Sequence, residues 1–97
     1  MRRHRTGPTP EHYPTAMIHD PNLGLSPKGV LLDLLAREDN PTLATLTAEG
    51  HARGQGETSA HFRKWLGELE KAGYLNRDPD ATDDDPVATD VYDTAQR

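Results

Sequence analysis

The chain has 97 residues, enough for one domain with a modest core, and its 33% of hydrophobic residues lies below the usual globular share. It contains no cysteine, no apolar run near the roughly 20 residues of a membrane span and no apolar signal segment, so we expect a cytoplasmic protein without disulfides, thiolate metal sites or a membrane partner. The net charge of −5 argues against a general nucleic-acid binder, but the acidity is confined to residues 78–97, which hold seven aspartates and one arginine.

Residues 1–12 are predicted to form a disordered basic arm. Arg2, Arg3 and Arg5 precede glycine and proline, and the stretch offers no apolar residue that would anchor it to a core. Such an arm could follow DNA phosphates or enter a minor groove, although composition favours a solvated terminus without a function. Residues 13–18 are predicted to form a short strand or single turn that packs on the core.

The first helix is predicted over residues 27–37. Ser26 opens it because serine caps helices, and Pro27 follows at the first helical position, where its missing amide costs nothing. Its apolar residues recur at helical spacing and form one buried stripe, which consists of Val30, Leu31, Leu34 and Leu35.

A second, shorter helix is predicted over residues 42–49, with Leu43 and Leu46 facing the core. The glycine-rich loop over residues 50–56 follows it and contains Arg53. This loop lacks the spacing of the known phosphate-binding motifs, so a flexible turn is favoured over a nucleotide site.

The third helix, over residues 58–72, has the strongest local signals. Thr58 or Ser59 can cap its start, Gly73 can end it, and between them the apolar residues at i, i+3, i+4 and i+7 are Phe62, Trp65, Leu66 and Leu69. The predicted core of the domain combines the three helices and the strand after them, and consists of Leu31, Leu34, Leu46, Phe62, Leu66, Leu69 and Leu75.

A C-terminal hairpin is predicted to pair residues 74–78 with residues 87–92. The second segment alternates, so that Val87, Thr89 and Val91 would share one side. The connection between the two strands is rich in aspartate, and residues 94–97 form a tail.

Residues 66–75, LGELEKAGYL, resemble the end of the recognition helix and the following strand in bacterial winged helix-turn-helix DNA-binding proteins of the small-regulator and replication-initiator types, in which Leu-x-Glu-Leu-Glu-x-x-Gly-Tyr-Leu recurs. The resemblance covers roughly residues 13–93. It implies a mainly α, α+β fold with three helices and a hairpin wing, and it implies DNA binding. The wing in this family commonly carries Arg or Lys, whereas here the acidic residues are Asp78, Asp80, Asp83, Asp84 and Asp85.

The first functional hypothesis is a sequence-specific binder of double-stranded DNA, acting as a transcriptional regulator with its third helix in a major groove. The candidate DNA-binding residues gather at the start of that helix and in the loop before it, and are Thr58, Ser59, His61, Arg63, Lys64 and Arg53. The alternative for these residues is an exposed, solvated helix face.

The second hypothesis is a protein-interaction module of the same fold, whose acidic wing and tail dock on a basic partner through Asp83, Asp84 and Asp85. An acidic wing folded over the third helix would favour this hypothesis, and a positive face joining that helix to the N-terminal arm would favour DNA. A homodimer could read a repeated site, although no long heptad seam is visible.

No enzymatic, metal or cofactor site is predicted. The five histidines form no H-x-x-x-H pair, and the aspartate run lacks the spacing of a calcium loop. Ser26 and Ser59 have no glycine elbow around them, which argues against a hydrolase.

Overall fold

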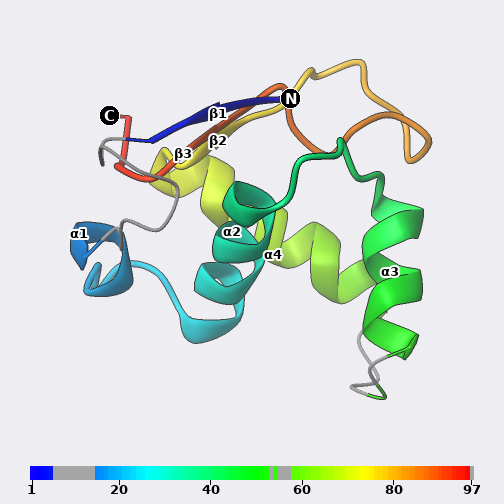
Figure 1. The fold of residues 1–97 in the computed structure, drawn as a ribbon, viewed down its shortest axis with the longest axis horizontal. Helices are drawn as coiled ribbons and strands as arrows, with labels where there is room; N and C mark the ends of the chain where they lie inside the picture. The colour runs from blue at the N-terminus through cyan, green and yellow to red at the C-terminus, as the bar shows by residue number, and fades with distance from the viewer. Residues whose placement is uncertain (6–14, 53, 55–57, 97) are drawn as a thin grey trace.

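The computed structural model describes residues 1–5, 15–52, 54 and 58–96. Along them the elements follow in the order β1 (Arg2–His4), α1 (Thr15–Ile18), α2 (Leu25–Ala36), α3 (Leu43–Ala52), α4 (Ser59–Ala72), β2 (Leu75–Asn76) and β3 (Asp90–Tyr92). The sheet lies along one edge of the molecule, α2 and α4 occupy the middle, and α3 lies at the end opposite α1 (Figure 1). The chain has a small α+β fold in which helices outweigh strands, as the sequence predicts.

Helix α4 confirms the predicted helix over residues 58–72. Thr58 is its N-cap: the Thr58 side chain accepts a hydrogen bond from the His61 backbone N–H, and the His61 ring accepts one from the Thr58 backbone N–H. Gly73 ends the helix with a φ of 92°, in the left-handed region that glycine enters without a steric penalty. One face of α4 packs against both α2 and α3, and it buries Phe62, Leu66 and Leu69.

Helices α2 and α3 each differ from their predicted bounds. Helix α2 begins before residue 27, because Gly24 rather than Ser26 stands at the N-cap and Pro27 lies in the first turn, where helical amides lack partners anyway. Helix α3 continues to Ala52, whereas its predicted end is residue 49. Gly50 is buried in the last turn of α3, and a single glycine weakens a helix without ending it.

Arg37 joins the end of α2 to α3. Its guanidinium donates to both carboxylate oxygens of Glu49 at 2.7 and 2.8 Å and to those of Asp39 at 2.7 and 3.0 Å, and it also bonds Asp33 at 3.1 Å. These charge-assisted bonds, the one to Asp39 foremost, raise the pKa of Arg37, and the Arg37 guanidinium in turn lowers the pKa of the Asp39 carboxyl. The network fixes the α2–α3 turn. Its Asp33–Arg37 pair has the local i,i+4 spacing, whereas no local sequence pattern indicates the bonds from Arg37 to Glu49.

The predicted hairpin is present in a shorter form. Strands β2 and β3 are antiparallel, with Leu75 opposite Val91 and Asn76 opposite Asp90. Only residues 90–92 of the second predicted strand are regular, and buried residues occur on both of its sides. The simple alternation fails because Asp90, on the second side of β3, is also buried, and its carboxylate bonds the Arg2 and His4 side chains of the neighbouring strand.

The N-terminal residues differ from the predicted disordered arm. Residues 2–4 form β1, which pairs in parallel with β3 at the outer edge of the sheet, and the strand order is β1-β3-β2. The buried Asp90 carboxylate bonds Arg2 and His4, each at 2.9 Å, while Met1 packs against the core. The prediction missed this strand because the partner that holds it lies 88 residues further along the chain. Residues 6–12 of the predicted arm lie outside the described residues.

The connection between β2 and β3 returns past the start of α3. Thr42 forms an isolated antiparallel bridge with Pro86, and the Val87 N–H donates to the Pro41 carbonyl oxygen at 3.0 Å. We call residues 78–86 the acidic loop, because five of these nine residues are aspartate. The bridge holds the end of the acidic loop beside α3 and the first turns of α4 (Figure 1).

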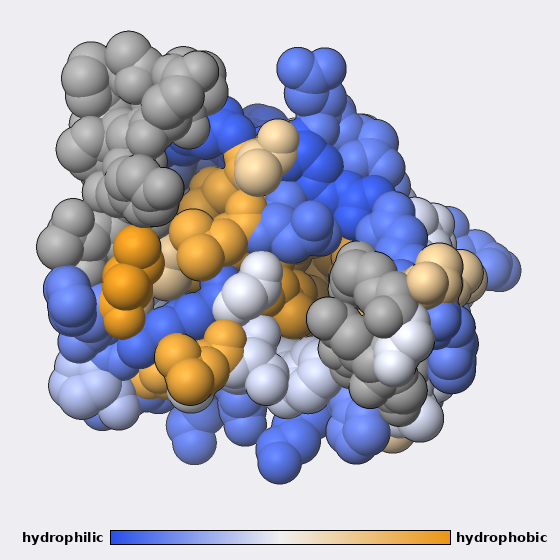
Figure 2. Space-filling view, turned by 60° about the horizontal axis from the view of Figure 1, so that its bottom comes forward, coloured by the Kyte–Doolittle hydropathy of each residue, from blue (hydrophilic) through white to orange (hydrophobic). Residues whose placement is uncertain are grey.

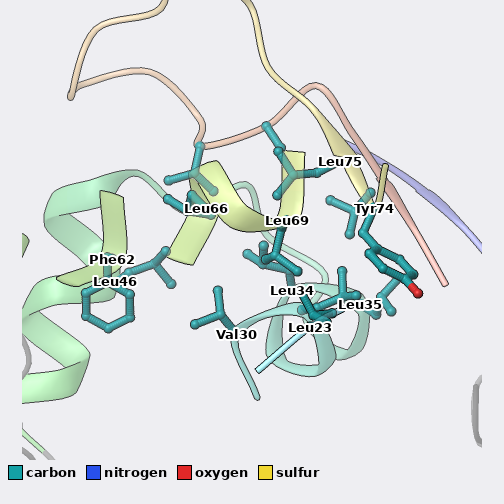
Figure 3. Packing of buried hydrophobic residues seen from close by; sticks show 14 of the residues in the cluster. Leu23, Val30, Leu34, Leu35, Leu46, Phe62, Leu66, Leu69, Tyr74 and Leu75 are labelled. Atoms are coloured by element: carbon teal, nitrogen blue, oxygen red, sulfur yellow. The ribbon is translucent and has the colours of Figure 1, made fainter. Parts of the chain in front are cut away.

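All seven predicted core residues are buried in one cluster, which confirms that prediction. Figure 3 shows side chains from α2, α3, α4 and β2 meeting in this cluster. Met17 of α1 is also fully buried, so the predicted turn over residues 13–18 packs on the core as a short helix in its described part. The Tyr74 hydroxyl donates to Asp20 at 2.6 Å, which joins the end of α4 to the turn after α1.

Replacing Leu66 by alanine should lower the free energy of unfolding by about 2–5 kcal/mol, because the side chain is fully buried and the vacated volume cannot close completely. Urea denaturation followed by circular dichroism measures this change. At a chain concentration of about 1 μM, below the range in which association would contribute, replacement of the exposed Leu25 by alanine is the matched control and should leave the midpoint nearly unchanged. Equal midpoints for wild type and Leu66→Ala would contradict the core packing.

Replacing Asp90 by asparagine should lower stability by on the order of 1 kcal/mol at pH 6, through lost charge-assisted bonds to partners that are partly exposed. The bond from His4, and after it that from Arg2, lowers the pKa of Asp90 from 3.8. A lowered carboxyl pKa gives stability that is complete above the ordinary pKa and is lost as the pH falls through the lowered value.

The difference between wild type and Asp90→Asn in urea midpoint should therefore shrink as the pH falls from about 5 to about 2. Asp84→Asn removes an exposed carboxylate and should match the wild type throughout. A difference that stays constant with pH would show that the Asp90 charge does not hold β1.

Candidate nucleic-acid interface

A surface groove of about 380 Å³ lies between α3, the start of α4 and the acidic loop. Most of its lining residues are apolar or carry a hydroxyl group, and one is an arginine and one an aspartate. The lining residues are Leu43, Ala44, Thr47, Ala48, His51, Ser59, Arg63 and Asp83. Two of the predicted DNA-binding residues, Ser59 and Arg63, therefore reach this groove.

Thr58 and His61 form the capping arrangement of α4. Because the Nδ1 atom of His61 accepts the hydrogen bond from the Thr58 N–H at 3.2 Å, a neutral ring carries its hydrogen on Nε2. The His61 ring also stacks on Trp65, with ring centroids 5.6 Å apart and planes 16° apart. His61 is thus held by two contacts, and its Nε2–H has no partner among the described residues and can donate to a ligand.

Arg63 bonds the acidic loop. Its guanidinium donates to the Asp83 carboxylate at 2.6 Å, and the side chains are 52% and 64% exposed. The DNA hypothesis assigns two cations to this helix, and one of them therefore already forms an ion pair with a carboxylate of the loop. Lys64, the other cation, is exposed and forms no ion pair with a described residue. Arg53 lies outside the described residues.

The acidic loop is folded toward α4 and bonds it through Asp83, and this is the arrangement expected if the partner is a protein. Its aspartates have different roles. Asp85 accepts hydrogen bonds from the Thr82 N–H at 2.9 Å and from the Thr82 hydroxyl at 3.3 Å, and Asp78 accepts one from the Asp80 N–H at 2.9 Å. These two side chains shape the turn. Asp83 bonds Arg63, which leaves Asp84 as an exposed carboxylate of the predicted docking triplet.

The N-terminal arginines are not brought to this groove. Arg2 bonds Asp90, and the Arg3 guanidinium donates to the carbonyl oxygens of Leu34, at 2.6 Å, and Asp39. Arg3 thereby satisfies a carbonyl in the last turn of α2, where helical carbonyls lack amide partners. Strand β1 lies at the sheet, away from the start of α4 beside α3 (Figure 1). The described residues therefore do not join the arm and α4 in one positive face.

Gly67 also lies on this face, and it is not among the predicted DNA-binding residues. It lies one turn after Arg63 and Lys64, and a Cβ atom at this position would meet no described atom within 4 Å. Glycine inside a helix costs stability relative to alanine, so close approach of a ligand backbone is one physical reason for it. The sequence signal was present, because Gly67 interrupts the strongest helical pattern in the chain.

Within residues 1–5, 15–52, 54 and 58–96, no group of three His, Asp or Glu side chains is placed to hold a metal ion. The described helices also include none that is long and apolar enough to cross a membrane.

Comparison of the chain with protein-family models, with curated proteins and with solved structures gave no match.

Proposed function

We propose that this chain is a winged helix-turn-helix domain that binds double-stranded DNA, with the first half of α4 in the major groove and the acidic loop as the wing. The order of α2, α3, α4 and the hairpin supports this proposal, as does the resemblance of residues 66–75 to that family. The bridge between Thr42 and Pro86 adds a contact between the start of α3 and the hairpin.

The observation that carries the proposal is the outer face of α4, where Arg63 and Lys64 are exposed beside the open Gly67 and the groove to α3. Guanidinium and ammonium groups at the start of a groove-entering helix suit phosphates and guanine. In the free protein, Arg63 forms an ion pair with the Asp83 carboxylate of the same chain. In the proposed complex a DNA phosphate replaces it.

The DNA proposal predicts that Arg63→Ala combined with Lys64→Ala abolishes binding to genomic fragments. The loss of two phosphate contacts should also lower the slope of log K against log salt by up to about 2. Fluorescence anisotropy at two or more salt concentrations measures both quantities.

Lys71→Ala is the matched control for Lys64→Ala, because Lys71 is an exposed cation of the same helix that lines a different groove, beside Asn22 and Gly24. Lys71→Ala should change the affinity much less than Lys64→Ala. Unchanged DNA affinity in the Arg63 and Lys64 double variant would show that α4 does not form the DNA interface.

A second candidate function is a protein-interaction module that docks its acidic loop on a basic partner. The five aspartates favour it, since carboxylates beside a polyanion repel it. The two functions differ in the expected effect of Asp83→Asn. An exposed ion pair is worth about 0.2–1 kcal/mol, so releasing Arg63 should tighten DNA binding by up to about fivefold.

Asp84→Asn is the control for Asp83→Asn, because it removes the same charge from the same loop without touching the Arg63 bond. If DNA is the partner, Asp83→Asn should increase the DNA affinity more than Asp84→Asn does. If neither variant binds DNA more tightly and both weaken binding to a basic protein, the interaction module replaces the DNA proposal.

A further inference from the structure

The outer side of α2 carries apolar and small residues where a surface helix normally carries polar ones. Leu25 is 86% exposed and Leu32 is 38% exposed, and these are the exposed large hydrophobic residues of the described chain. With Gly29 and Ala36 they follow at spacings of four, three and four residues, which places all four on one stripe along the helix. Figure 2 shows separate hydrophobic areas on the face of the molecule that it brings forward. Helix α2 is thus apolar on both its buried side and its outer side.

Gly29 in the middle of this stripe has no role in packing within the described chain. A Cβ atom there would meet no described atom within 4 Å, and glycine inside a helix costs stability relative to alanine. A helix surface without a side chain lets a second backbone approach closely. The glycine therefore fits a face that another helix covers.

The charges beside the stripe indicate which helix this is. Lys28 and Asp33 lie on opposite flanks of the stripe, five residues apart, and Asp33 remains 51% exposed although it also pairs with Arg37. In a parallel pair of helices, the contact positions of a seven-residue repeat are called a and d, and the flanking positions e and g. If Leu25 and Leu32 take position d, then Gly29 and Ala36 take position a. Lys28 then takes position g and Asp33 position e. Positions g and e five residues apart meet across such a pair. The face is therefore complementary in charge to itself.

We propose that α2 docks in parallel against α2 of a second copy of the chain, about a two-fold axis along the helices. Leucine layers alternate with glycine and alanine layers, and Lys28 of each copy bonds Asp33 of the partner subunit. Helix α2 has 12 residues and is about 18 Å long, which places the contact at the small end of interface sizes and makes the dimer reversible. The inference does not depend on DNA binding.

Sedimentation equilibrium of the full chain, from about 10 μM to about 1 mM, tests the proposal. The wild type should show a concentration-dependent dimer, and Gly29→Arg should raise the dissociation constant at least about tenfold. Arginine is the better helix former, so the melting temperature of Gly29→Arg should not fall, which separates lost association from lost folding. Gly67→Arg, at the similarly open glycine of α4, should leave the dissociation constant unchanged.

The parallel orientation has its own test. Lys28→Glu and Asp33→Lys should each weaken the dimer, and combining them should restore it, because the exchanged charges again meet across the pair. The single Asp33→Lys variant also carries the loss of the Asp33 bond to Arg37, so its comparison with the double variant isolates the effect of Lys28. A wild type that is monomeric at every concentration overturns the proposal, and so does a Gly29→Arg variant that dimerises as tightly as the wild type. A charge-swapped variant no tighter than Lys28→Glu overturns the parallel arrangement.

Discussion

The burial of one face of α4 is the constraint on which the other elements depend. Leu66 and Leu69 are fully buried, and the face that carries them packs against α2 and α3 together. With its apolar side fixed in this way, α4 must turn Arg63 and Lys64 outward, and Gly73 must direct the chain into the sheet. The position of the candidate interface is therefore a consequence of core packing.

Local signals predicted this part of the structure well. Helix α4 has all of its signals within one short stretch of sequence: the cap at Thr58, the stop at Gly73 and the spacing of Phe62, Leu66 and Leu69. Such local signals can be recognised without knowledge of the tertiary structure. The seven core residues followed from the same periodicity. The bounds of α2 and α3 were less accurate, because a possible cap at Ser26 and a glycine at residue 50 are weak constraints when tertiary packing opposes them.

Two of the ion pairs that sequence reasoning missed join residues far apart in the chain. Arg63 meets Asp83 across 20 residues, and Arg37 meets Glu49 across 12. In each pair the charges were visible but their pairing was not, since any of 16 acidic residues could have served as partner. The result changes how the net charge of −5 bears on function. Asp90 and Asp83 neutralise cations of the chain itself, so the carboxylates open to a partner are fewer than the composition suggests.

The parallel pairing of β1 with β3 has a consequence for the order of folding. Arg2 lies opposite Asp90, so this edge of the sheet cannot close until a segment 88 residues later has left the ribosome. Helices α2 to α4 can pack before that moment, because their contacts span shorter stretches of chain. Until β3 is synthesised, the exposed edge and its arginines have no native partner strand, and the newly made chain is then most open to chaperones and to non-native pairing.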